Sequence, residues 1–177
     1  AEAGTTLTTG TNNTALGYRA MYSNADGDNN TAIGYRALYT MDPSGNADMY
    51  NVAVGHDAGL SVTTGVENVL IGGLAGDAIT SGGYNTALGH AALGASILPS
   101  FNTAIGNASL ASNVHGHKNT AVGQATLAVM APTGSADTHN TAVGFHAGTA
   151  VTTGIQNTIM GSLAGDALTT GSRNVAI

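Results

Sequence analysis

A five-residue motif repeats through the whole chain at a nearly fixed spacing. Its clearest copy is Asn-Thr-Ala-Ile-Gly at residues 30–34, and nine related copies accompany it. Successive motif asparagines lie 17, 21, 17, 17, 17, 17, 21, 17 and 17 residues apart. The ten asparagines are Asn13, Asn30, Asn51, Asn68, Asn85, Asn102, Asn119, Asn140, Asn157 and Asn174. Self-similarity at a fixed period predicts a solenoid, in which each motif opens one coil.

The motif itself predicts a short strand, because its side chains alternate in character. The residue before the motif glycine is aliphatic, and the residue two positions earlier is Thr or Val, which favours strands. We expect these two columns to line the interior of a roll. The residue between them points the other way and is Ala in all but two copies. The outward column is thus predicted to contain Ala15, Ala32, Ala53, Leu70, Ala87, Ala104, Ala121, Ala142 and Ile159.

The remainder of each coil predicts a second short strand, joined to the first by turns. Asparagine is a common turn residue, and stacked coils would let the motif amides hydrogen-bond along the axis as a ladder. Two coils carry four extra residues, within 41–48 and 130–137, where Pro and Gly indicate protruding turns. The predicted fold class is all-β: a parallel β-solenoid of about ten coils, forming one repeat array over residues 1–177. We expect this array to be a segment of a longer fibre.

Composition excludes several classes of partner. Only 8% of the residues are charged, against about a quarter in an average soluble chain. The net charge is -6 with four Lys and Arg residues in total, so no nucleic-acid partner is expected. There is no cysteine to form a disulfide or a thiolate metal site. No apolar run approaches the roughly 20 residues of a membrane helix, so no membrane insertion is expected.

The motif resembles the head repeat of trimeric autotransporter adhesins, in which Thr or Val, Ala, an aliphatic residue and Gly are followed by Ala or Ser. The wording of residues 30–38, Asn-Thr-Ala-Ile-Gly-Tyr-Arg-Ala-Leu, is closer still to repeats of phage tail fibres. The resemblance implies a left-handed β-roll, a homotrimeric rod, and a place at a cell surface or in a virion tail fibre. Two features depart from the adhesin heads: their coils are shorter than 17 residues, and they usually have Ser where this chain has Asn.

Self-association is the first partner that we expect. A thin roll buries little apolar surface against the backbone entropy of each coil, so further burial between rods would help. The predicted outward Ala column, with Leu70 and Ile159, is the candidate trimer interface. The unpaired strand edges at the two ends suggest head-to-tail stacking as well. A surface glycan or receptor is the second expected partner, because the variable residue after the motif glycine includes Tyr18, Tyr35, His56, His90 and Phe145.

No catalytic residue, metal site or cofactor is expected. His115 and His117 flank one glycine and could hold a metal loosely, but a solvated turn explains them better. Residues 24–28 have calcium-like spacing without the bidentate Glu of an EF-hand loop. The expected function is therefore structural or adhesive, in an extracellular fibre that attaches to a host or surface. The alternatives are an ice-binding or filament-forming solenoid and, less favoured, a left-handed β-helix acyltransferase, whose hexapeptide rhythm is absent here.

Overall fold

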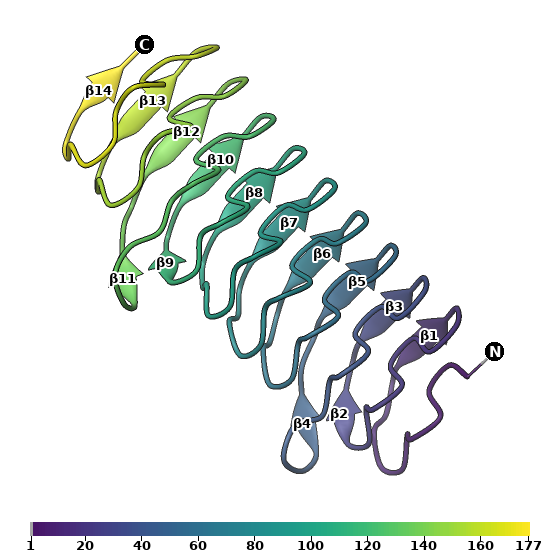
Figure 1. Ribbon diagram of the computed structural model, residues 1–177. Helices are drawn as coiled ribbons and strands as arrows, with labels where there is room; N and C mark the ends of the chain where they lie inside the picture. Colours follow the sequence, from purple (N-terminus) through teal and green to yellow (C-terminus); the bar gives the residue numbers. More distant parts are fainter. Residues whose placement is uncertain (1) are drawn as a thin grey trace.

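Each copy of the motif forms one short strand, and the ten strands pair side by side in a single parallel sheet (Figure 1). The computed structural model describes residues 2–177, which contain strands and turns but no helix. Each strand pairs in register, so Thr86, Ala87 and Leu88 lie beside Thr103, Ala104 and Ile105. The strands are β1 (Thr14–Leu16), β3 (Thr31–Ile33), β5 (Val52–Val54), β6 (Val69–Ile71), β7 (Thr86–Leu88), β8 (Thr103–Ile105), β10 (Thr120–Val122), β12 (Thr141–Val143), β13 (Thr158–Met160) and β14 (Val175–Ala176). The parallel β-solenoid of about ten coils is thus confirmed.

The four-residue insertions form a second kind of strand pair. In the first long coil, β4 (Ala47–Asp48) pairs with β2 (Gly27–Asp28) of the coil before it, and in the second, β11 (Ala136–Asp137) pairs with β9 (Gly116–His117) of the coil before it. Both pairs lie on the same edge of the rod, away from the ten-stranded sheet (Figure 1). Because the insertions are taken up at this edge, the main sheet keeps its register across coils of 17 and 21 residues.

The interior of the roll is lined by the Ala column, and our prediction for this column was wrong. From Ala32 to Ile159 these side chains are completely buried, and Ala15 in the first strand is partly buried. The Thr or Val column and the aliphatic column point outward instead, with Leu88 and Met160 exposed by 45% and 47%. The alternation predicted from the motif is present, but its direction is reversed.

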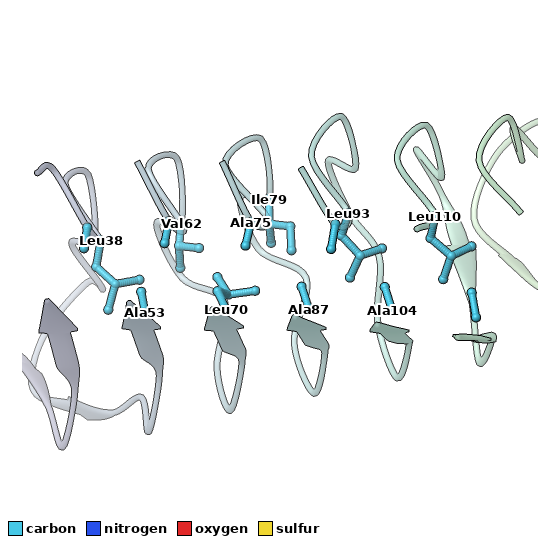
Figure 2. Close-up of a cluster of buried hydrophobic side chains, with 14 of the residues drawn as sticks. Leu38, Ala53, Val62, Leu70, Ala75, Ile79, Ala87, Leu93, Ala104 and Leu110 are labelled. Carbon is cyan, nitrogen blue, oxygen red and sulfur yellow. The ribbon is translucent and has the colours of Figure 1, made fainter. Parts of the chain in front are cut away.

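The reversal follows from the narrow interior, where a small side chain on the sheet faces a large one on the opposite wall. Figure 2 shows Ala53, Ala87 and Ala104 on the strands, with Leu93 and Leu110 reaching toward them. Where the strand side chain is large, the opposite wall carries glycine. A Cβ added to Gly76 would lie 2.8 Å from Leu70 Cδ2, and one added to Gly148 would lie 2.7 Å from Ile159 Cδ1. A larger side chain on one wall is therefore matched by a smaller residue on the other, so that the side-chain volume filling the interior stays similar from coil to coil.

The second strand predicted for each coil is missing from most coils. The opposite wall is made of turns, in which two residues per coil adopt left-handed backbone angles, as Arg36 (φ 51°) and Leu38 (φ 49°) do. An extended strand cannot contain such residues. Backbone hydrogen bonds still join neighbouring coils here, for example from Leu38 N–H to the Ala58 carbonyl at 3.0 Å. Within residues 2–177, regular pairing outside the main sheet is limited to the two short pairs at the insertions.

Candidate interaction surfaces

The motif asparagines form a continuous hydrogen-bonded ladder inside the roll. Asn68 is representative: its Oδ1 accepts the backbone N–H of Asn85 (3.1 Å) and the Nδ2 of Asn85 (2.9 Å). Its own Nδ2 donates to Asn51 Oδ1 (3.1 Å) and to the Gly82 carbonyl (3.0 Å). The amides from Asn30 to Asn157 are buried. This column holds the coils together and is closed to any ligand.

The outward face of the ten-stranded sheet carries no charged side chain in its strands. It presents the Thr or Val column beside the aliphatic column, and neither column contains a charged residue. The aliphatic side chains are partly or fully exposed, with Leu16 at 65%. This column comprises Leu16, Ile33, Val54, Ile71, Leu88, Ile105, Val122, Val143, Met160 and Ile177. We assigned the candidate trimer interface to the Ala column, and it is therefore reassigned to this face.

The column after the motif glycine stacks three of its rings over the first three coils. The ring centroids of Tyr18 and Tyr35 are 5.4 Å apart, and those of Tyr35 and His56 are 4.9 Å apart. All three side chains are exposed. Beside them, the rings of Tyr22 and Tyr39 stack at 5.3 Å with an interplanar angle of 7°. The structure thus brings three of the five predicted contact residues into one ladder.

Two arginines tie the two ring columns together. The Cζ of Arg19 lies 5.1 Å from the ring centroids of both Tyr18 and Tyr22, and the Cζ of Arg36 lies 5.0 Å from that of Tyr35, which are cation–π distances. Sequence reasoning missed both arginines, together with Tyr22 and Tyr39. The signal was present, because Gly-Tyr-Arg-Ala-x-Tyr occurs in the first two coils, at residues 17–22 and 34–39. Together with His56, these residues form what we call the tyrosine–arginine patch: Tyr18, Arg19, Tyr22, Tyr35, Arg36, Tyr39 and His56.

Both arginines of this patch are paired with carboxylates. Arg36 donates to the two Asp57 oxygens through Nε (2.9 Å) and Nη2 (2.6 Å), and Asp57 is only 4% exposed. Arg19 donates from Nε to Glu2 at 2.6 Å. These hydrogen bonds raise the pKa of each guanidinium above its ordinary value. The patch therefore has fixed side chains and little net charge.

The other two predicted contact residues stand apart from this patch. Gly73 follows His56 in the column and contributes no side chain, so the ladder stops there. His90 is exposed and lies 3.5 Å from the Asn107 amide nitrogen through its Nδ1. Phe145 packs against its neighbour His146, with ring centroids 4.2 Å apart. Neither residue belongs to a larger cluster of aromatic side chains.

One serine–histidine contact resembles a catalytic pair in distance alone. His117 Nε2 lies 2.6 Å from Ser135 Oγ, while its Nδ1 accepts the backbone N–H of Ser100 at 3.0 Å. The ring proton must then sit on Nε2 and be donated to Ser135, so the histidine cannot take the serine proton. Burial lowers the pKa of His117, which favours this neutral form. The contact joins two coils and does not activate a nucleophile.

The calcium-like segment is occupied by its own hydrogen bonds. Asn24 accepts the Gly27 N–H at 2.9 Å and donates to the Gly27 carbonyl at 3.0 Å, closing a turn. Asp26 accepts the Thr9 hydroxyl at 2.7 Å. In the part of the chain that the structure describes, no three His, Cys, Asp or Glu residues are grouped so that they could hold a metal ion. No helix among residues 2–177 is long and apolar enough to cross a membrane.

Comparisons with protein-family models, with curated proteins and with solved structures find no match to this chain.

Proposed function

We propose that this chain is a structural segment of an extracellular or virion fibre, a shaft or head that holds adhesive contacts. Rods associate side by side through the outward face of the ten-stranded sheet. The observation that supports the proposal most is the uninterrupted, uncharged character of this face over ten coils, since the Thr or Val and aliphatic columns repeat without one charged residue. The exposed aliphatic side chains of neighbouring strands lie side by side on this face, and contiguous exposed apolar side chains mark interaction sites.

A second copy of the chain suits this face for geometric reasons. Both columns repeat with the strand spacing of about 4.8 Å, so two rods in parallel contact would match along their whole length. Covering the exposed aliphatic side chains would add apolar burial, at about 25 cal/mol per Å², to a core that holds few large side chains per coil. The resemblance to trimeric adhesin heads implies three copies. The Thr hydroxyls can remain hydrated at the rim or bond across the contact.

The association is tested by measuring the molar mass in solution. Sedimentation equilibrium of the wild-type chain should give three times the 17.4 kDa of one chain. Ile105→Glu places a charge in the middle of the outward face and should give a folded monomer, because a buried unpaired carboxylate is costly. Gln124→Glu adds the same charge on an exposed residue outside these columns and should leave the mass unchanged. A monomeric wild-type chain, or an Ile105→Glu variant that still associates, would refute the interface.

Ice binding is the second candidate, and the direction of the Thr column favours it. We expected this column inside the roll, but the structure turns it outward, so a regular array of hydroxyl and methyl groups lies on the outward face of the sheet. Val52, Val69 and Val175 interrupt it. A monomeric rod that separates the freezing and melting temperatures of ice would support this candidate over the fibre. The threonines of the array are Thr14, Thr31, Thr86, Thr103, Thr120, Thr141 and Thr158.

A further inference from the structure

The tyrosine–arginine patch differs from the same positions of every later coil. It gathers four of the six tyrosines and two of the four cationic residues of the chain into the first two coils. In the later coils the position of Tyr22 and Tyr39 is taken by smaller residues, such as Gly94 and Ala111. A concentration of Tyr and Arg in one place is typical of binding hot spots, where these two residue types are enriched.

The side chains of the patch are held in place before any ligand arrives. Each stacked ring is fixed by its neighbour in the next coil, and Arg19 is held between two rings and Glu2. Tyr18 and Tyr35 are nevertheless exposed by 43% and 42%. Rigid aromatic groups lose little conformational entropy on binding, so contacts to them are retained as affinity.

The polar groups of the patch suit a neutral, hydroxyl-rich ligand. Its two guanidinium charges are already balanced by Glu2 and Asp57, and the net charge of -6 repels polyanions. No hydrogen bond within residues 2–177 uses a tyrosine hydroxyl or the Nη1 of Arg36. These groups can therefore exchange hydrogen bonds with sugar hydroxyls, while the exposed ring edges contact the C–H groups of the sugar.

The spacing of the rings along the rod specifies the shape of that ligand. Successive rungs lie 4.9–5.4 Å apart, which is close to the length of one sugar unit in a β-1,4-linked chain. We propose that the patch binds a neutral, linear β-1,4-linked polysaccharide that lies along the rod axis, one sugar unit per coil. The ladder has three rungs, Tyr18, Tyr35 and His56, and ends at Gly73. This inference rests on the proposed role of the fibre in attachment and names the ligand class of its contact site.

The test is isothermal titration calorimetry of the full chain with two neutral series, cello-oligosaccharides and chito-oligosaccharides of one to six units. Affinity for at least one series should rise from one to three units and change little beyond three, because a fourth unit would lie over Gly73. The double variant Tyr18→Ala/Tyr35→Ala should weaken binding of the trisaccharide by about tenfold or more, as expected when an aromatic hot-spot contact is lost.

The matched control removes a second stacked pair from another column. Tyr84 and Phe101 lie 4.8 Å apart with an interplanar angle of 3° and are similarly exposed. Tyr84→Ala/Phe101→Ala should leave the affinity unchanged, and circular dichroism should show that both double variants remain folded. The proposal is overturned if neither series binds, if affinity is independent of length, or if both variants weaken binding equally. Sedimentation reports the association separately, so failure of the sugar site and failure of the rod interface can be told apart.

Discussion

Replacing Asn85 by alanine tests the idea that the buried amide ladder stabilises the solenoid. Asn85 accepts the backbone N–H of Asn102 at 3.1 Å, and its Nδ2 donates to the Pro99 carbonyl at 2.9 Å. Both backbone groups belong to buried residues, and neither makes another hydrogen bond within residues 2–177. Asn85→Ala would therefore leave one buried donor and one buried acceptor without partners.

The size of the effect follows from these two groups. Each buried polar group that loses its partner destabilises the fold by about 1–3 kcal/mol, so the free energy of unfolding of the variant should be about 2–6 kcal/mol lower. This loss is a large part of the 5–15 kcal/mol by which a typical domain is stable. It also falls in the centre of the rod, where each coil depends on its two neighbours.

Urea unfolding followed by far-ultraviolet circular dichroism measures this loss, with the protein concentration held fixed so that association does not change between samples. Hydrogen exchange of the Asn102 amide should also become much faster in the variant. Asn107→Ala is the control, because Asn107 is exposed and its amide contacts only His90, at 3.4–3.5 Å. A loss below about 1 kcal/mol for Asn85→Ala, or equal losses for the two variants, would show that the ladder stabilises little.

Three further predictions concern the core, the motif glycine and one carboxyl. Leu70→Ala should lower the free energy of unfolding by about 2–5 kcal/mol, because a fully buried side chain is removed opposite glycines that cannot fill the cavity. Leu98→Ala on the surface should lower it little in the same urea assay. Equal losses for the two variants would contradict the packing. Gly106→Ala should lower the melting temperature strongly, since φ is +128° and the new Cβ would lie 2.5 Å from the Gly123 carbonyl oxygen; an unchanged melting temperature would contradict this close approach. Burial raises the pKa of Asp77 above its ordinary value, so the folded state holds that proton more tightly and wild-type stability falls as pH rises through the folded pKa. The difference in stability between Asp77→Asn and wild type should therefore favour the variant more at pH 7 than at pH 3. An equal difference at both pH values would contradict the burial effect.

Much of the fold could be read from the spacing of the motif alone. Identical side chains recurring every 17 residues place identical groups beside one another in stacked coils, which determines parallel strands, their register and the asparagine ladder. The insertions could also be placed, because their Pro and Gly residues occupy the same position in two coils. Tyr18, Tyr35 and His56 share one column of the repeat, so their neighbouring positions in the aromatic ladder follow from the same spacing.

The direction in which each column points was decided by tertiary structure. Ranking side chains by hydrophobicity placed the Ile column inside and the Ala column outside, and the structure has the opposite arrangement. One signal was available: Asn102 and Ala104 lie two positions apart and so share a face, and an amide ladder stabilises a roll only when it is buried. The remaining information lies on the opposite wall, where Leu110 and its equivalents fill the interior. Because the two walls of a narrow roll divide one fixed volume, the size of a side chain on one wall depends on residues far from it in the sequence.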